Sequence, residues 1–303
     1  MQIEPDYDAL VVGGSFAGLA AATYIARAKR RVLVVDGGQP RNHFSPAAHG
    51  FLGHDGLPPG EILATARGQV LAYPNATLRT GEVVAIQPNA SGFDVRLNDG
   101  TAISSRKLVM ATGLRDELPA LPGLSERWGR TVLHCPYCHG YETGGSPLGV
   151  LATHPMSAHQ ANLVHDWGSV TFFTNGAPLP DEETVAKLIA RGVVFETAPI
   201  AALLGNAPAL TGVVLADGRE LPLNALFVAP VLHQCPLVTQ LRLDMDESPT
   251  GPIVRTDERR MTSVPGIYAA GDIVRSGHSV SFAVADGVMA GISLHQALVA
   301  EAA

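Results

Sequence analysis

The sequence predicts an α/β fold in which a second α/β domain is inserted into the first. A strand–turn–helix–strand pattern occupies residues 7–36, and a second α/β pattern follows a Pro/Gly-rich crossover at 118–123. Another Pro/Gly-rich passage at 248–252 then returns the chain to a last strand and a long apolar helix. We therefore expect one domain formed by residues 1–116 and 246–303, and an inserted domain formed by residues 117–245. A length of 303 residues is typical of two domains.

The first pattern has the features of a nucleotide-binding unit. An apolar strand at 7–12 precedes the turn Gly-Gly-Ser-Phe-Ala-Gly at 13–18, a helix at about 16–29 and a strand at 31–35 that ends in Asp36. Amide groups at the start of such a helix face a pyrophosphate. Asp36 follows Gly18 by 18 residues, where an acidic side chain holds ribose hydroxyls. Ser15 replaces the second glycine of the usual pattern. An ordinary glycine turn is the alternative, but the strand, helix and Asp36 favour a nucleotide site.

The remaining segments extend this arrangement. Short alternating runs between 76 and 103 predict a small antiparallel element on the first domain. A strand at 107–110 leads into Ala-Thr-Gly at 111–113, and the second α/β pattern covers about 132–241. A last strand is expected at 266–270. The apolar stretch 282–300 is interrupted by Asp286, His295 and Gln296, which predicts a buried helix and not a membrane span.

Composition narrows the function. The formal net charge is -7, which argues against a nucleic-acid partner because phosphate neutralisation requires clustered Lys and Arg. The first eight residues contain Glu4, Asp6 and Asp8, unlike the positive start of a secretory signal, so we expect a cytoplasmic enzyme with no membrane association. Only three cysteines are present, and two are three positions apart. In a reducing compartment, such a pair indicates redox or metal chemistry.

Cys135 and Cys138 form a C-x-x-C motif that we expect at the start of a helix. This position lowers the pKa of one thiol, and the thiolate is the nucleophile. The alternative, half of a zinc site, would require a second ligand pair. His134 and His139 flank the motif, but no second pair at metal spacing follows, so we expect no metal. Cys235 is isolated and is predicted to be a small buried apolar side chain.

Three motifs together resemble a known family. Residues 265–272 resemble the C-terminal flavin fingerprint of disulfide reductases with two dinucleotide-binding domains, and residues 111–113 resemble the loop where their chain leaves the FAD domain. The place of the C-x-x-C motif resembles low-molecular-weight thioredoxin reductases. The resemblance implies a homodimeric FAD flavoprotein with a thioredoxin-reductase-like fold, in which Asp272 bonds the ribityl chain. It also implies that Cys138 faces the flavin and that Cys135 meets the substrate.

The resemblance further implies a set of residues that contact FAD. These residues are Gly13, Ser15, Phe16, Ala17, Asp36, Gly37, Arg41, Asn42, Val83, Ala111, Thr112, Gly113, Gly271, Asp272, His278, Ser279 and Val280.

Two positions depart from thioredoxin reductases beside the reacting groups. His139 replaces the acid/base aspartate of that family, and a histidine titrates near neutrality and can move thiol protons. A helix-capping or surface role is the alternative for His139. The flavin-side Arg-Gln-Ala of true thioredoxin reductases aligns here with His278, Ser279 and Val280.

The second domain lacks the usual features of an NADPH site. After the predicted strand 148–151, Ala152 and His154 replace the two leading glycines, and Pro155 has no amide hydrogen to donate. The next strand, 170–173, is followed by Thr-Asn-Gly at 174–176, where NADPH enzymes of the family carry arginines. We therefore expect no NADPH binding in the usual mode.

This combination resembles the thioredoxin-reductase-like dithiol oxidases that close disulfides in natural products such as gliotoxin and holomycin. The similar segments are 13–19, 36–42 and 135–142. The resemblance implies that the catalytic residues are Cys135, Cys138 and His139, that a small-molecule dithiol is the substrate, and that dioxygen is the electron acceptor. One alternative is a reductase of a protein disulfide that receives electrons from ferredoxin or another flavoprotein. A second alternative is a redox sensor that binds flavin without turnover.

Overall fold

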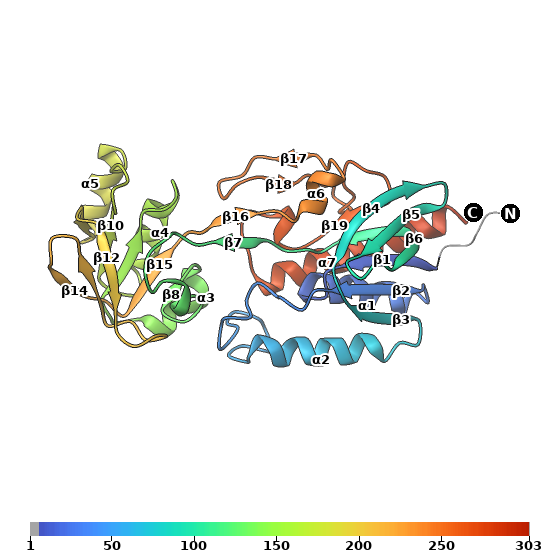
Figure 1. The fold of residues 1–303 in the computed structure, drawn as a ribbon, viewed down its shortest axis with the longest axis horizontal. Coiled ribbons are helices and arrows are strands. Elements are labelled where there is room, and N and C mark those ends of the chain that lie inside the picture. Colours follow the sequence, from blue (N-terminus) through green and yellow to red (C-terminus); the bar gives the residue numbers. More distant parts are fainter. Residues whose placement is uncertain (1–5, 303) are drawn as a thin grey trace. The chain divides into compact units, whose positions relative to one another are not determined.

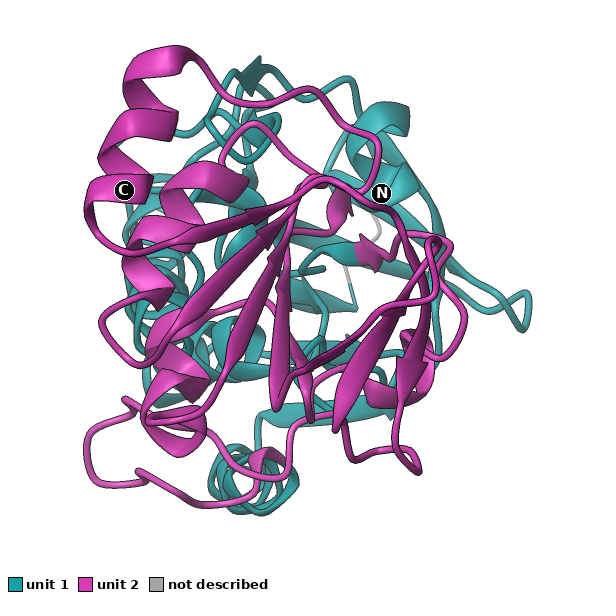
Figure 2. Cartoon of the chain, turned by 90° about the vertical axis from the view of Figure 1, so that its left-hand side faces the viewer, with its two compact units in different colours: residues 1–43, 60–115, 233–303 teal, residues 44–59, 116–232 magenta. Residues whose placement is uncertain are grey.

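The computed structural model describes residues 6–302 and divides into two compact units (Figures 1 and 2). The first unit takes in the chain up to residue 43, residues 60–115 and the chain from residue 233 onward, and the second contains residues 44–59 and 116–232. These boundaries differ from the expected ones in three places, the smallest being residue 116, which groups with the second unit. Residues 44–59 group with the second unit, and residues 233–245 group with the first. These residues pack against the unit with which they group, although they lie in another part of the chain.

A seven-stranded sheet forms the centre of the first unit, with the order β3-β2-β1-β6-β5-β4 and β19 beside β6. The strands β3, β2, β1, β6 and β19 are parallel, whereas β4 and β5 continue the sheet in antiparallel fashion. Their bounds are β1 (Tyr7–Val12), β2 (Val32–Asp36), β3 (Ala76–Thr80), β4 (Val83–Asn89), β5 (Gly92–Leu97), β6 (Ala102–Met110) and β19 (Ile267–Ala269).

The register of this sheet brings four loops to one edge. Val12 pairs with Val35 of β2 and with Met110 of β6, and Met110 also pairs with Ala269 of β19. Because parallel strands end at the same edge, the loops that follow β1, β2, β6 and β19 lie together there, which is where open α/β sheets bind ligands.

The helices of the first unit include a closely packed pair. Helix α7 lies along α1, and a Cβ atom at Gly287 would overlap the carbonyl oxygen of Ala17. Among residues 6–302, α7 is the one helix whose length and composition would allow it to cross a membrane. It instead packs in the fold, where its Asp286 is 1% exposed and accepts hydrogen bonds from Arg275. The helix bounds are α1 (Phe16–Arg27), α2 (Pro59–Leu71), α6 (Pro236–Gln240) and α7 (Val280–Ala300), with a 3-10 turn η2 (Asp272–Val274).

The second unit is built on a five-stranded parallel sheet, β11-β10-β9-β15-β8, and a three-stranded antiparallel sheet, β12-β13-β14. Its strands are β8 (Val132–Leu133), β9 (Leu148–Leu151), β10 (Val170–Phe173), β11 (Val194–Glu196), β12 (Ile200–Leu204), β13 (Gly212–Leu215), β14 (Glu220–Pro222) and β15 (Ala225–Val228). Its helices are α3 (Pro136–Thr143), α4 (Ser157–Val164) and α5 (Glu182–Ala190), with a 3-10 turn η1 (Ser125–Arg127).

Two further strand pairs complete the fold. Strands β7 (Arg115–Glu117) and β16 (Val231–His233) pair where the chain passes between the units, and β17 (Met245–Asp246) pairs with β18 (Ile253–Val254).

The structure corrects two expectations about the first domain. Residues 76–80 are not antiparallel, because β3 pairs in parallel with β2 and extends the parallel sheet. A short edge strand has the same alternation of apolar and polar residues whether it pairs in parallel or antiparallel fashion. The sequence pattern therefore did not distinguish the two kinds of pairing. Residues 59–71 form helix α2, in a segment for which no helix was predicted, and Gly60 and Gly68 weaken its helical propensity.

Candidate active site

The first part of the candidate site is the turn after β1. Gly13 has φ +109°, and a Cβ atom there would overlap the carbonyl oxygen of Ala111 in the neighbouring loop, so only glycine fits. Ser15 is the N-cap of α1 with an extended backbone, and its side chain makes no capping hydrogen bond. Phe16 and Ala17 form the buried first turn of that helix. A turn of this form directs a helix N-terminus toward an anionic ligand at the sheet edge.

Asp36 ends β2 directly beside this turn. Its Oδ1 accepts hydrogen bonds from the amides of Gly14 (3.3 Å) and Gly38 (3.1 Å), and its Oδ2 accepts one from Arg67 Nη2 (2.6 Å). A carboxylate has about four acceptor positions, so capacity remains for ribose hydroxyls. Arg67 comes from α2 and was missed in the sequence, because no helix was expected there. Its Nε is buried and has no partner among residues 6–302.

The other end of the predicted FAD site, which we call the flavin end of the cradle, is formed by residues far apart in the chain. Arg41 Nη1 donates to Asp272 Oδ2 (2.9 Å) and to His278 Nδ1 (3.0 Å), and His278 Nε2 donates to the carbonyl oxygen of Arg275 (3.0 Å). These partners fix a neutral His278 ring with its proton on Nε2. Thr112, in the loop after β6, has a buried hydroxyl with no partner among the described residues. Such an orphaned polar group fits a ligand that supplies its hydrogen bond.

The remaining residues of the predicted FAD set lie on the same unit. Val83 is the first residue of β4, is 6% exposed and packs in the core of the first unit. Ser279 is the N-cap of α7 and accepts a hydrogen bond from the Phe282 amide (3.0 Å). The other members occupy the loops at the sheet edge or the start of a helix: Gly37, Asn42, Ala111, Gly113, Gly271 and Val280. The arrangement fits a bound dinucleotide.

The second unit has its own candidate site, a disulfide at the start of α3. Cys135 is the N-cap of this helix, Pro136 is its first residue, and a disulfide joins Cys135 to Cys138. The Cys138 amide donates to Cys135 Sγ (3.2 Å). An amide donor and a helix N-terminus both stabilise a thiolate, so the thiolate of Cys135 is favoured when the disulfide opens. Trp167 packs against α3, with its ring edge-on to Tyr137 at 5.8 Å between centroids.

His139 follows the disulfide directly and is partly buried. Burial lowers the pKa of His139 below its ordinary value, the nearby Glu142 carboxylate opposes this shift, and the His49 ring adds to it. The neutral imidazole, which can accept a thiol proton, is therefore present at neutral pH. Glu142 is a functional candidate that sequence reasoning did not single out. His49 is one of three histidines, with His43 and His54, that the sequence offers as possible pocket residues without a defined role. Glu142 could have been found from its spacing of one helical turn, whereas His49 comes from the distant loop 44–59.

His134 has a supporting place beside the disulfide. Its carbonyl oxygen accepts a hydrogen bond from Gln160 Nε2 (2.6 Å), and its Nδ1 lies 3.3 Å from the carbonyl oxygen of Val228. These contacts attach the residue before Cys135 to α4 and to the end of β15, as expected for a scaffold residue.

The loop between β9 and α4, for which we expect no usual NADPH site, bonds its own amides. The Ser157 hydroxyl accepts from the amides of Thr153 (3.3 Å) and His154 (3.1 Å), and His154 Nδ1 accepts from the Met156 amide (3.1 Å). Pro155 has no amide hydrogen. The Ala152 and Ser157 amides donate to the carbonyls of Phe173 and His154. Every amide hydrogen of residues 152–157 thus has a partner within the chain, and none is left for a pyrophosphate.

The segment after β10 is also used by the fold itself. Asn175 Oδ1 accepts a hydrogen bond from the Ile200 amide (2.8 Å), and Thr174 is 3% exposed. The position that carries phosphate-binding arginines in NADPH enzymes therefore holds a structural turn.

Two other features of the first unit are separate from this chemistry. Cys235 is half-buried at the start of α6, where burial raises the pKa of its thiol and makes it a poor nucleophile.

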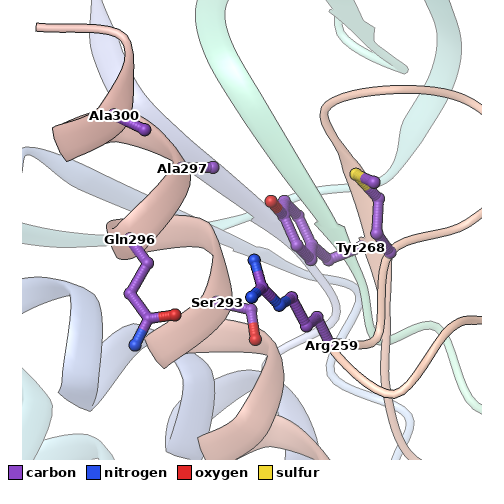
Figure 3. Close-up of a pocket in the computed structure, with 7 residues that line it drawn as sticks. Arg259, Tyr268, Ser293, Gln296, Ala297 and Ala300 are labelled. Atoms are coloured by element: carbon purple, nitrogen blue, oxygen red, sulfur yellow. The ribbon is translucent and has the colours of Figure 1, made fainter. Parts of the chain in front are cut away.

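A pocket of about 170 Å³ lies between the β19 segment and the later part of α7, lined by Tyr268, Ser293 and Gln296 among others (Figure 3). Gln296 follows Val280 by 16 residues, or about 24 Å of helix, so the pocket is remote from the predicted flavin contacts at the start of α7.

Comparison with known proteins gives consistent matches. Residues 7–162 match the model of the family described as pyridine nucleotide-disulphide oxidoreductase. A protein from Claviceps purpurea (strain 20.1), named thioredoxin reductase tcpT, is 32% identical over 300 residues that cover 94% of this chain and 92% of the relative. The crystal structure of an oxidoreductase from Agrobacterium tumefaciens has a TM-score of 0.91 at 43% identity and covers 98% of this chain and 99% of that one. The structure of HlmI has a TM-score of 0.92 at 38% identity, with coverages of 100% and 96%.

Proposed function

The chain belongs to the pyridine nucleotide-disulphide oxidoreductase family, and on this premise we propose that it is an FAD-dependent dithiol oxidase that closes a disulfide in a small-molecule dithiol. The family membership makes it a flavin-dependent disulfide oxidoreductase. The choice of FAD is supported by Asp36, Gly13 and Asp272, which lie along one sheet edge at the places that suit, in that order, an adenosine ribose, a pyrophosphate and a ribityl chain.

The proposed reaction begins with two thiol–disulfide exchanges. His139 accepts the proton of one substrate thiol, and the thiolate attacks Cys135 Sγ, which breaks the Cys135–Cys138 bond and releases the Cys138 thiolate. The second substrate thiol then gives its proton to the Cys138 thiolate and attacks the substrate sulfur of the mixed disulfide, which releases the Cys135 thiolate. The Cys138 amide and the helix N-terminus stabilise that leaving group. The substrate leaves oxidised by two electrons, and the enzyme dithiol holds those electrons.

The disulfide is then restored. FAD, when bound, would supply the two-electron acceptor that restores the Cys135–Cys138 disulfide, with dioxygen as the final acceptor and hydrogen peroxide as its product. Cys138 is the residue that must reach the flavin, and His139 returns to its neutral form when it loses its proton.

The direction of electron flow is inferred from the loop at 152–157, because every amide hydrogen of this loop has a hydrogen-bond partner within the chain. A reductase that takes its electrons from a pyridine nucleotide in the usual mode would bind it at this loop, and the pyrophosphate would have to displace the Ser157 hydroxyl and the His154 ring from their amides. Burial also lowers the pKa of His154, so the ring is neutral at neutral pH and offers the phosphates no positive charge.

NADPH and NADH are therefore expected to reduce the flavin slowly or not at all. The measurement is stopped-flow absorbance of the purified holoprotein mixed anaerobically with each nucleotide at micromolar concentrations. Rapid bleaching that saturates with nucleotide concentration would show that the loop opens to admit it. A small dithiol in place of the nucleotide serves as the positive control.

The proposed function is tested by oxygen uptake with a panel of small dithiols. We expect dithiol-dependent consumption of dioxygen with about one peroxide formed per disulfide, because one two-electron oxidation reduces one dioxygen. The proposal would be falsified if dithiol-reduced flavin remained reduced in air while a reduced protein donor drove reduction of a protein disulfide through the same cysteines.

That alternative, a reductase with an acidic donor such as ferredoxin, would require a positive surface near the flavin. The turn after α1 does concentrate positive charge, with Arg27, Lys29, Arg30 and Arg31. However, α1 has twelve residues, about 18 Å, and this turn lies at the opposite end of the helix from the glycine turn. A donor bound there would be remote from the flavin end of the cradle, whereas dioxygen needs no docking surface.

A further inference from the structure

One acidic side chain, Glu142, and a second histidine, His49, act on His139 in a way that the reaction described above does not use. On α3, Glu142 follows His139 by three residues, so the two side chains are neighbours on the helix surface. The carboxylate acts on the imidazole, because it opposes the fall in the pKa of His139 that burial causes. A carboxylate beside a catalytic imidazole stabilises its protonated form, which arises when the imidazole accepts a thiol proton.

Glu142 is itself held from the other side by His49. The His49 ring lies between two carboxylates, with Nε2 3.4 Å from Glu142 Oε1 and Nδ1 3.7 Å from Asp55 Oδ1. The side chain of His49 is 23% exposed, whereas that of Glu142 is 41% exposed. The more buried imidazole thus restricts the more exposed carboxylate.

The loop that carries His49 has a closed shape. Ala48 and Leu57 form an antiparallel bridge, and Asp55 Oδ1 accepts a hydrogen bond from the Gly50 amide (2.7 Å). The Gly56 amide donates to the carbonyl oxygen of Ala48 (2.9 Å). Because these bonds fix both ends of the loop, His49 has a defined position beside α3.

We propose that Glu142 and His49 are positioning residues that set the acid–base behaviour of His139: Glu142 favours the protonated imidazole, and His49 limits that effect by sharing the same carboxylate. The inference rests on the proposed function, since it assigns a proton-transfer role to His139. The groups that face His139 are Glu142 on its own helix and His49 on the loop 44–59, with Asp55 behind His49. Tyr137 and Trp167 pack on the same helix and are uncharged.

A metal site is a different use for such a cluster. Among residues 6–302, no group of three or more His, Cys, Asp and Glu side chains is arranged to hold a metal ion. Charge sharing between neighbouring side chains is the use that this geometry favours.

The test is a titration of the His139 ring by NMR in the oxidised holoprotein, followed through its ring carbon. Glu142→Gln keeps the size of the side chain and removes its charge, so the titration midpoint of His139 should fall. His49→Gln removes the competing ring, so the midpoint should rise. Glu183→Gln is the matched control, because Glu183 is an exposed carboxylate on helix α5 of the same unit, paired with Lys187 four residues on, and it should leave the midpoint unchanged.

Turnover provides a second readout. Glu142→Gln should lower kcat for dithiol oxidation by roughly tenfold and move the acidic limb of the pH profile to lower pH, which is less than the roughly hundredfold loss expected for His139→Ala. Opposite movements of the titration midpoint in the two variants support the roles assigned to Glu142 and His49. No movement, movement in one variant only, or movement of both in the same direction overturns those roles. Because the NMR titration needs no turnover, absence of dithiol oxidation would refute the proposed function alone.

Discussion

Replacing Cys138 by serine is expected to lower dithiol turnover by roughly a thousandfold or more, because no disulfide can then form or be restored at the start of α3. Cys135→Ser should have an equally large effect on turnover. The two variants should nevertheless differ. With Cys135→Ser, the Cys138 thiolate remains and should add a long-wavelength absorption band beside the flavin. With Cys138→Ser, that band should be absent, while Cys135 can still trap a substrate as a mixed disulfide.

The structure gives a reason for this difference. In Cys138→Ser, the residue at 138 still has an amide that can donate to Cys135 Sγ, so the Cys135 thiolate keeps its hydrogen bond and remains a reactive nucleophile. Absorbance spectra and mass spectrometry of protein treated with an activated disulfide measure the two properties. Cys235→Ser is the matched control and should turn over normally, because its thiol is half-buried and has a raised pKa. A long-wavelength band in Cys138→Ser would reverse the assigned roles.

Replacing Gly18 by alanine should cause the loss of bound flavin and lower the free energy of unfolding by about 1–3 kcal/mol or more. A Cβ atom at this position would overlap the carbonyl oxygen of Gly13, so α1 must move away from the turn that precedes it. That movement would separate the helix N-terminus from the sheet edge where the cofactor is expected. The measurements are the ratio of flavin to protein absorbance after purification, and urea unfolding.

Gly68→Ala is the matched control for this substitution. Gly68 lies in α2, and a Cβ atom there meets nothing within 4 Å. Alanine is a better helix former than glycine, so this variant should keep its flavin and gain about 0.5–1 kcal/mol of stability. A yellow Gly18→Ala protein of unchanged stability would contradict the close packing of α1 on the turn. Release of FMN instead of FAD from the wild type would contradict the choice of cofactor.

The sequence by itself determined those features that depend on residues close together in the chain. The turn at 13–18 and Asp36 follow from one strand–turn–helix–strand unit, and the structure has β1, α1 and β2 there. Cys135 and Cys138 are three residues apart at a helix start, so their pairing needs no distant partner. The missing glycines at 152 and 154 were likewise visible, because a pyrophosphate loop requires particular residues at fixed spacing.

Only the tertiary structure decided the contacts between distant residues. Arg41 meets Asp272 across 231 positions, Arg67 reaches Asp36 from a helix that was not predicted, and Glu142 meets His49 from the loop 44–59. Local sequence fixes backbone conformation over a few residues, but which distant side chains meet depends on how helices and loops pack on the sheet. The same holds for the loop at 152–157: its sequence shows that the glycines are absent, and its fold shows that Ser157 and His154 occupy the amides that a phosphate would need.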